Sequence, residues 1–278
     1  MIEWWQHIPE NLNPIVFTVG FFSFYWYAFF YLLGWASAFF LAKLLVAKGV
    51  SSGISQEDVS DLFVWLLVVA LLGGKIGYLF FYMLPFFPME QSFFLPYDFA
   101  SESWQGIAGM SYHGSLIAVA FALLLFYRAK KLDFWKGADM VALCAPLAIF
   151  FGRLGNFVNT ELPGRITAAP WGMYFPEIFP QGVLRHPSSL YEAFFEGILL
   201  FLILLFFRKQ FQFSGALATL YLMFYAVLRF IAEIFREPDV QVGYFFGGLT
   251  LGQVLSLGMF IVGLFLFLSR KSKKYGIL

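Results

Sequence analysis

Charged residues are scarce in this chain of 278 residues, and their scarcity is the first guide to its class. Lys, Arg, Asp and Glu make up 13% of the sequence, whereas hydrophobic residues make up 60%. An ordinary soluble domain has about twice that share of charge, so a soluble globular protein is excluded. The net charge of +1 provides no basic surface, and a nucleic-acid partner is not expected.

Cysteine and histidine are also scarce. The single cysteine, Cys144, excludes a disulfide within the chain, and its apolar neighbours favour a small buried side chain. The three histidines show no metal-ligand spacing, so no metal is expected. The sequence contains no glycine-rich phosphate loop and no Gly-x-Ser-x-Gly nucleophile elbow, and no cofactor of another kind is expected.

Long apolar runs take the place of the missing charge. About 20 apolar residues are needed for one helix to cross a bilayer. A cleavable signal peptide begins with basic residues, and this chain has no Lys or Arg before Lys43. We therefore predict an all-α integral membrane protein with about seven transmembrane helices, a retained N-terminus and one polytopic membrane domain over 1–278. The apolar runs lie near residues 15–41, 59–84, 113–127, 137–156, 187–207, 215–235 and 249–268.

The cationic residues divide into two groups by their positions. Twelve of the 18 lie in or beside four connections between the apolar runs. Because cytoplasmic loops carry an excess of Lys and Arg, we predict that all four connections are cytoplasmic, with the N-terminus outside. These twelve are Lys43, Lys48, Arg128, Lys130, Lys131, Lys136, Arg208, Lys209, Arg270, Lys271, Lys273 and Lys274.

The other six cations fall on the outer side or in the outer half of a helix. With a rise of 1.5 Å per residue, Lys75 lies about 24 Å from the inner end of its helix, and Arg229 about 9 Å below an outer end. Charges at such depth are costly unless they are paired or functional. They indicate an anion site near the outer surface. The six are Lys75, Arg153, Arg165, Arg185, Arg229 and Arg236.

The longest outer connection, residues 157–186, is rich in proline, glycine and aromatic residues. A disordered segment would contain few aromatic residues. We therefore predict a small folded cap on the periplasmic side, between the fourth and fifth helices.

The densest polar cluster follows the fourth apolar run. If that helix continues to Asn156, Arg153 and Asn156 share one face, because they are three residues apart. Asn159 and Glu161 follow where the chain leaves the membrane, and Gly164 would let a lipid headgroup approach the backbone closely. An arginine that extends to the interface is a purely structural alternative, but it does not account for the crowding of polar groups.

A second charged cluster contains Arg229, Glu233 and Arg236. Their spacing of four and then three residues would place them on one helical stripe. An ion pair that only makes two buried charges tolerable is the alternative explanation. It leaves open why the charges occur within the span at all.

Histidine and tyrosine residues near the outer boundary complete the candidate site. His113 opens the third apolar run, while His186 and Tyr191 lie at the start of the fifth. A structural role and a catalytic role both remain open for these histidines. Tyr27 lies in the outer part of the first run, where an aromatic belt is the default explanation.

These segments resemble the prolipoprotein diacylglyceryl transferases, a family of bacterial inner-membrane enzymes. Residues 152–164 fit the family signature Gly-Arg-x-Gly-Asn-Phe-x-Asn-x-Glu-x-x-Gly at every fixed position. His113-Gly114 and the runs 186–192 and 229–239 also resemble family segments, in the same order. The resemblance therefore covers nearly the whole chain.

The resemblance implies an activity and substrates. The family transfers the diacylglyceryl group of phosphatidylglycerol to the lipobox cysteine of prolipoproteins, which forms a thioether and releases glycerol phosphate. A monomeric enzyme without a cofactor is expected. The chain departs from common family residues at Lys75, which replaces an arginine, at Ser115, which replaces a glycine, and at Ser189, which replaces a glutamine. Tyr25-Trp26-Tyr27-Ala28 also departs, because the family often has His or Arg followed by Trp-Tyr-Gly there.

The resemblance also implies roles for individual residues. Arg153 and Arg229 would clamp the phosphate, Glu233 would orient Arg229, and His113 is the favoured base, with Glu161 less favoured. The remaining substrate-binding candidates are Tyr27, Lys75, Asn156, Asn159, Glu161, Gly164, His186, Tyr191 and Arg236.

Two other classes also place charge inside helices. A lipid or small-anion transporter often has inverted repeats and a site near the midplane, whereas here the charges gather near the outer surface without a visible repeat. A purely scaffolding membrane protein would gain nothing from six costly outer cations. Formation of a thioether product discriminates the enzyme from both.

Overall fold

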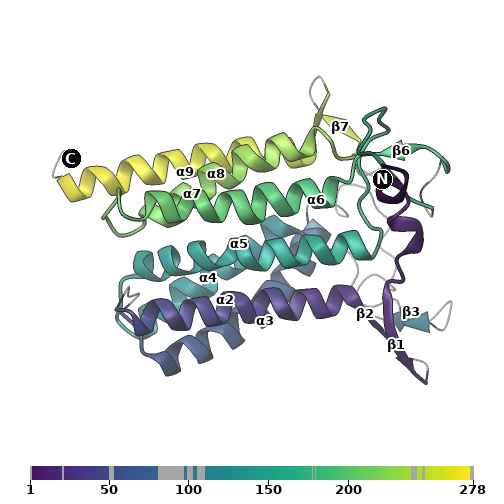
Figure 1. Cartoon of the computed structure of the whole chain (residues 1–278). Helices are drawn as coiled ribbons and strands as arrows, with labels where there is room; N and C mark the ends of the chain where they lie inside the picture. The colour runs from purple at the N-terminus through teal and green to yellow at the C-terminus, as the bar shows by residue number, and fades with distance from the viewer. Residues whose placement is uncertain are drawn as a thin grey trace. The chain divides into compact units, whose positions relative to one another are not determined.

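The structure is a computed structural model that describes residues 2–20, 22–49, 53–80, 97–98, 103–104, 110–176, 178, 180–238, 243–245 and 248–275 (Figure 1). In this part of the chain, seven helices are long and apolar enough to cross a membrane, which confirms the predicted fold class. The seven spans are α2 (Trp26–Ala47), α3 (Gln56–Tyr78), α4 (Tyr112–Ala129), α5 (Phe134–Val158), the continuous span Ser188–Phe207, α8 (Ala216–Glu233) and α9 (Leu251–Tyr275).

The chain divides into two compact units. The first unit contains Met1–Ser52 and Ala138–Leu278, and the second contains Gly53–Gly137. Five of the spans lie wholly or mostly in the first unit, and α3 and α4 form the second. The single membrane domain expected from the sequence stays a prediction.

The first span starts later than its hydropathy indicated. The predicted start near residue 15 is wrong, because β1 (Ile15–Val19) and β2 (Phe22–Tyr25) form an antiparallel hairpin before α2 begins at Trp26. Gly20 has a φ of 63°, which suits the tight turn between the strands. Mean hydropathy depends on the composition of a segment and not on the spacing of its apolar residues, so it does not distinguish an apolar hairpin from an apolar helix.

The fifth span is not a uniform α-helix. It consists of α6 (Ser188–Glu192), a π-helix over Ala193–Leu199 and α7 (Leu200–Phe207). Within the π-helix, Gly197 lies against α5, where an added Cβ would be 2.6 Å from the Cβ of Phe150. The glycine therefore lets these two helices approach each other closely.

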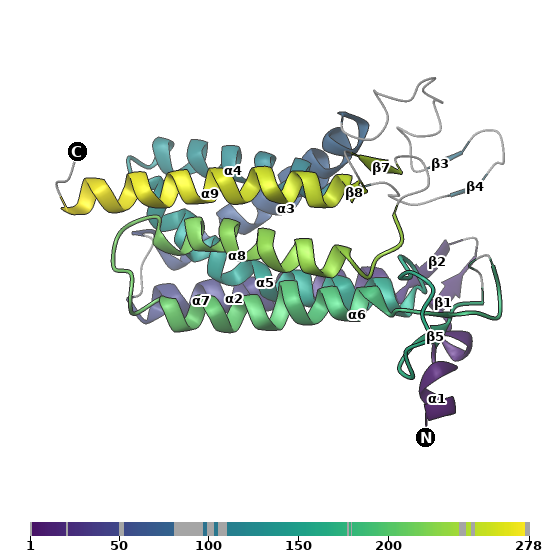
Figure 2. The same ribbon diagram turned by 90° about the horizontal axis from the view of Figure 1, so that it is seen from above.

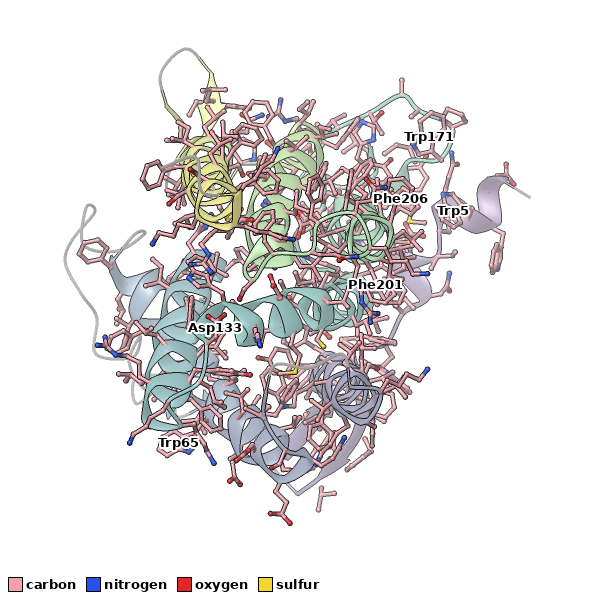
Figure 3. The ribbon with its side chains drawn as sticks, turned by 90° about the vertical axis from the view of Figure 1, so that its left-hand side faces the viewer. Trp5, Trp65, Asp133, Trp171, Phe201 and Phe206 are labelled. Atoms are coloured by element: carbon pink, nitrogen blue, oxygen red, sulfur yellow. The ribbon has the colours of Figure 1, made fainter. Side chains whose placement is uncertain are left out.

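The lipid-facing surface of the first unit is apolar. Phe40 on α2, Phe206 on α7 and Phe265 on α9 are each about two-thirds exposed, and Figure 3 shows Phe206 with its neighbour Phe201. Large exposed apolar side chains on several helices are typical of a surface that contacts lipid or another partner and not water. They support the assignment of these helices as membrane spans.

One end of the first unit contains the basic C-terminal part of α9 and the basic residues between α7 and α8. The C-terminal end of α9 and the loop between α7 and α8 lie together there (Figure 1). Lys274 donates to the carbonyl of Gln212 at 2.7 Å, and Arg270 donates to that of Ser214 at 3.1 Å. Asp139 also accepts from the backbone N–H of Gly215 at 2.8 Å, next to the start of α8.

The opposite end of the first unit contains short elements that pack around the 157–186 connection (Figure 2). Trp5 donates to the carbonyl of Trp171 at 2.9 Å, and the two side chains lie close together in Figure 3. The connection is folded as far as it is described. The elements are α1 (Ile2–Gln6), the 3₁₀ turn Pro9–Asn11, β5 (Met173–Tyr174) paired with β6 (Leu184–Arg185), and β7 (Tyr244–Phe245) paired with β8 (Leu249–Thr250).

Small residues hold the two helices of the second unit together. An added Cβ on Gly77 of α3 would lie 2.4 Å from the Cα of Gly114 on α4, and one on Gly73 would lie 2.9 Å from the carbonyl oxygen of Gly114. Such small-residue contacts are typical of helix pairs in membranes. The unit also contains the short strands β3 (Tyr97–Asp98) and β4 (Ser103–Trp104). Most of residues 85–112, which we expect to form an outer loop between the second and third spans, lies outside the described residues.

Candidate functional site: a buried cluster of arginine and glutamate

Arg153 lies near the C-terminal end of α5, which continues through Asn156 to Val158 as the spacing argument required. Its guanidinium group forms two ion pairs with the fifth span. Nη1 lies 2.8 Å from Oε2 of Glu192, and Nη2 lies 3.1 Å from Oε2 of Glu196. Both carboxylates are fully buried.

Arg229 lies one turn before the end of α8 and pairs with the same two carboxylates. Its Nη1 lies 2.8 Å from Oε1 of Glu192 and 3.1 Å from Oε1 of Glu196. Its Nη2 forms the expected pair with Glu233, four residues further along α8. Each of the two buried glutamates therefore bridges Arg153 and Arg229 with separate oxygens.

Arg236 joins the cluster by a route that differs from the predicted one. The helical stripe expected for it is wrong, because α8 ends at Glu233 and Arg236 lies beyond the helix, in a β-bridge with Gly164. Its Nη1 still reaches Oε1 of Glu192 at 3.3 Å. Glu233 is held from the other side by the hydroxyl of Thr250, which donates at 3.0 Å.

The charges of this cluster are balanced, but their exposure is not. Three guanidinium groups face three carboxylates, so the burial of each charge is compensated by a partner. The side chains of Arg153 and Arg229 are 17% and 11% exposed, whereas those of Glu192 and Glu196 are 0% exposed. The accessible side of the cluster is therefore cationic and suited to an anionic group.

Glu192 and Glu196 are the functional candidates that sequence reasoning missed. Glu192 was only part of a family motif, and Glu196 was not considered. A signal was present, because two carboxylates four residues apart in an apolar span are rare and usually have a partner or a function. The anion that the intramembrane arginines require is supplied, at least in part, by the chain itself.

The polar residues at the end of α5 and directly after it form a second arrangement. Glu161 accepts hydrogen bonds from the amide of Asn156 at 3.0 Å and from that of Asn159 at 2.9 Å. Tyr27 of α2 packs against the same part of α5, where a Cβ on Gly155 would be 3.0 Å from its Cδ2. The structure thus brings these signature residues and Tyr27 to one end of the first unit.

Gly164 occupies a position that no other residue could fill without a shift. An added Cβ would lie 2.5 Å from the carbonyl oxygen of Phe235 and 2.6 Å from that of His186. Its N–H donates to His186 at 2.8 Å. This crowding, rather than access for a headgroup, explains the glycine in the structure.

His186 and Tyr191 belong to a hydrogen-bonded chain at the start of the fifth span. Trp171 donates from Nε1 to the Tyr191 hydroxyl at 2.8 Å, and that hydroxyl lies 3.1 Å from Nδ1 of His186. Because an indole nitrogen only donates, the tyrosine hydrogen is free to bond to Nδ1, which leaves the imidazole proton on Nε2. Burial lowers the pKa of His186, so the neutral ring is favoured.

Lys75 and His113 belong to the second unit. Lys75 lies on α3 between Gly73 and Gly77, and His113 lies in the first turn of α4. Ser111 caps α4 by accepting from the N–H of Gly114 at 3.3 Å. The structure therefore places both residues beside the glycine contact of α3 and α4.

The profile of the prolipoprotein diacylglyceryl transferase family matches residues 14–269. The chain belongs to this family. The phosphatidylglycerol–prolipoprotein diacylglyceryl transferase of Chlorobaculum tepidum is 43% identical over 264 residues, which cover 94% of this chain and 91% of the relative. The transferase of the same name from Campylobacter jejuni is 40% identical over 279 residues and covers 99% and 100%.

A third relative, from another species, shows a likeness that covers most of the chain. The phosphatidylglycerol–prolipoprotein diacylglyceryl transferase of Campylobacter hominis is 41% identical over 268 residues, with 94% of this chain and 92% of the relative covered. The matched region contains both Arg153 on α5 and Arg229 on α8. The resemblance inferred from the signature is thereby confirmed at the level of the family.

Proposed function

We propose that this chain is a phosphatidylglycerol–prolipoprotein diacylglyceryl transferase. It transfers the diacylglyceryl group of phosphatidylglycerol to the lipobox cysteine of a prolipoprotein, the first step of bacterial lipoprotein maturation. Membership of the family supports the reaction. The observation that carries the assignment of the site is the arginine cluster, whose exposed side is cationic while its carboxylates are buried.

The reaction needs stabilisation of a phosphate leaving group. Sulfur attacks the glycerol carbon that bears the phosphate, the C–O bond breaks, and its electron pair stays on the phosphate oxygen. Negative charge therefore increases there, and preorganised donors in a low-dielectric site stabilise it. Arg153 and Arg229 are proposed as these donors, since Glu192 and Glu196 already hold both side chains in place.

The thiol must also lose its proton, because the thiolate is the nucleophile and a free cysteine has a pKa of about 8.5. His113 is proposed as the base, and the proton would pass from sulfur to its imidazole. Glu161 is the second candidate. Both of its carboxylate oxygens already accept hydrogen bonds, one from the amide of Asn156 and one from that of Asn159.

Further side chains are proposed to bind the substrates. The amides of Asn156 and Asn159 lie next to the cluster, on or just after α5. Glu233 orients Arg229, and Gly164 keeps the chain close to the start of the fifth span. The other proposed substrate contacts are Tyr27, Lys75, His186, Tyr191 and Arg236.

The proposed site faces the periplasm. The basic end of α9 and the loop between α7 and α8 lie at the opposite end of the first unit and would be cytoplasmic under the positive-inside rule. The N-terminus would then be outside and the C-terminus inside. We further propose that the enzyme acts as a monomer without a cofactor.

A reconstituted assay tests the proposal. The purified protein is incubated with phosphatidylglycerol and a lipobox peptide, and the products are analysed by mass spectrometry. We expect a thioether-linked diacylglyceryl peptide and glycerol phosphate in equal amounts, and no product with a peptide whose cysteine is replaced by serine. Movement of lipid or anion across vesicles without any thioether would instead support the transporter.

A further inference from the structure

Glu196 pairs with a different set of arginines from the other two carboxylates of the cluster. Glu233 pairs with Arg229, and Glu192 pairs with three arginines, one of which is Arg236. Glu196 pairs with Arg153 and Arg229 at 3.1 Å each. Its partners are therefore the two arginines proposed to clamp the phosphate.

Two guanidinium groups this close repel each other unless an anion lies between them, and the repulsion is strong where water is excluded. Glu196 places one oxygen on each group, Oε2 on Arg153 and Oε1 on Arg229. The hydroxyl of Tyr225 on α8 donates to Oε2 at 3.3 Å. The carboxylate is thus held by two ion pairs, one to α5 and one to α8, and the contact with Tyr225 is a long hydrogen bond beside them.

The π-helix is what brings this carboxylate to the arginines. Glu196 lies in the middle of Ala193–Leu199, directly before Gly197. The missing side chain at Gly197 lets the π-helix approach Phe150, and Arg153 follows one turn later on α5. Short π-helical segments are rare and often occur at functional sites, and this one contains Glu196 at its centre.

We propose that Glu196 is a positioning residue for diacylglyceryl transfer. This inference rests on the proposed function. The side chain of Glu196 is 0% exposed, so it acts through Arg153 and Arg229 and does not touch the lipid. It keeps the two guanidinium groups in one fixed arrangement, ready for the charge that develops on the leaving phosphate.

The proposal predicts a separation of binding from turnover. In Glu196→Gln the side chain keeps its size, but the cluster changes from balanced charge to an excess of one positive charge. Binding of the anionic lipid should then be unchanged or tighter, while the arginines keep the bridge through Glu192 but lose the second bridge that fixes their arrangement. We expect kcat to fall about 10- to 100-fold, with KM for phosphatidylglycerol unchanged or lower.

The experiment compares the wild type with Glu196→Gln, Glu196→Asp and Tyr225→Phe in one detergent. Steady-state kinetics give kcat and KM, and the stoichiometry of bound phosphatidylglycerol gives the fraction of folded sites. Glu196→Asp restores the charge with a shorter reach, so it should recover part of kcat. Tyr225→Phe keeps both ion pairs, and its kcat should stay within about threefold of the wild type.

Three results would overturn the proposal. One is wild-type kcat in both Glu196 variants, and another is an equal loss of kcat in Tyr225→Phe, which would assign the effect to the hydrogen bond. A loss of kcat in proportion to the fraction of folded sites would show that Glu196 only stabilises the fold. A wild-type protein that makes no thioether would instead refute the proposed function, which is a separate outcome.

Discussion

The buried arginines of this protein are stabilised by paired carboxylates, and the same arginines are proposed to bind the phosphate. Removal of one partner from a buried ion pair costs about 3 to 5 kcal/mol, because the other charge is left uncompensated, whereas removal of both partners costs less. Arg229 and Glu233 form such a pair at the edge of the cluster. Stability and activity can therefore be separated by single and double substitutions.

Arg229→Gln should destabilise the protein, because it leaves three carboxylates facing two arginines. The double variant Arg229→Gln with Glu233→Gln restores the balance of charge. We expect thermal unfolding to show that the double variant regains most of the lost stability. It should still transfer diacylglyceryl to a lipobox peptide about 10² to 10³-fold more slowly than the wild type, since one phosphate donor is gone.

Near-normal transfer by this double variant would contradict the clamp role of Arg229. The pair would then serve only to make two buried charges tolerable. Glu233→Gln alone is the matched control, because it keeps Arg229 in contact with Glu192 and Glu196.

The lowered pKa of His186 predicts that the stability of the folded protein depends on pH. Burial lowers this pKa below its ordinary value of 6.5, so the unfolded chain binds the proton more readily than the folded protein does. The stabilising contribution is present above pH 6.5 and is lost as the pH falls toward the folded pKa. The melting temperature should therefore decrease on acidification below that pH, and His186→Gln should reduce this decrease.

Equal pH dependence in the wild type and in His186→Gln would show that other groups cause the decrease. Tyr191→Phe is a useful second variant, since it leaves the histidine in place but removes the hydroxyl that bonds to Nδ1.

At the level of elements, two glycines of the same signature have different surroundings. Gly164 lies against the backbone of Phe235 and His186, whereas an added Cβ on Gly152 would meet nothing within 4 Å. Gly164→Ala should lower the free energy of unfolding by about 1 to 3 kcal/mol through overpacking. It should also reduce transfer, because it shifts the start of the fifth span.

Gly152→Ala is the matched control for this prediction. An alanine inside a helix is up to about 1 kcal/mol more favourable than a glycine, so the melting temperature should stay the same or rise. If Gly152→Ala nevertheless lost activity while remaining folded, the open space beside Gly152 would be needed by a substrate. Equal destabilisation by both substitutions would contradict the packing argument.

The orientation of the whole molecule is testable with cysteine labels. Gln181 lies exposed in the 157–186 connection, and Lys131 lies exposed in the connection between α4 and α5. A cysteine at Gln181 should react with a membrane-impermeant reagent in intact spheroplasts, and one at Lys131 should react only after lysis. Cys144 is buried and provides a low background.

Labelling of Lys131→Cys from outside would reverse the orientation and place the arginine cluster on the cytoplasmic side. The proposed function would then fail, because its site must face the periplasm. Ser101, another candidate position for a label in the second unit, lies outside the described residues.

Much of the architecture could be predicted from the sequence because a bilayer imposes simple rules on each segment. Span length, apolar composition and the distribution of Lys and Arg are local properties, and they identified seven spans with the correct order. The signature, which begins in the last turns of α5, identified the family for a similar reason, since its residues are contiguous. The start of α2 was missed, because Ile15–Tyr25 is apolar in a hairpin as it would be in a helix.

Membrane class, the number of spans and family membership were thus determined by the sequence itself. Only the tertiary structure decided how the charges are paired. Arg153 and Glu196 are 43 residues apart, and Arg229 and Glu196 are 33 apart, so no local pattern connects them. Helix packing and the π-helix bring them together, and because a buried charge is stable only with its partner, the role of each arginine depends on contacts that a linear sequence does not contain.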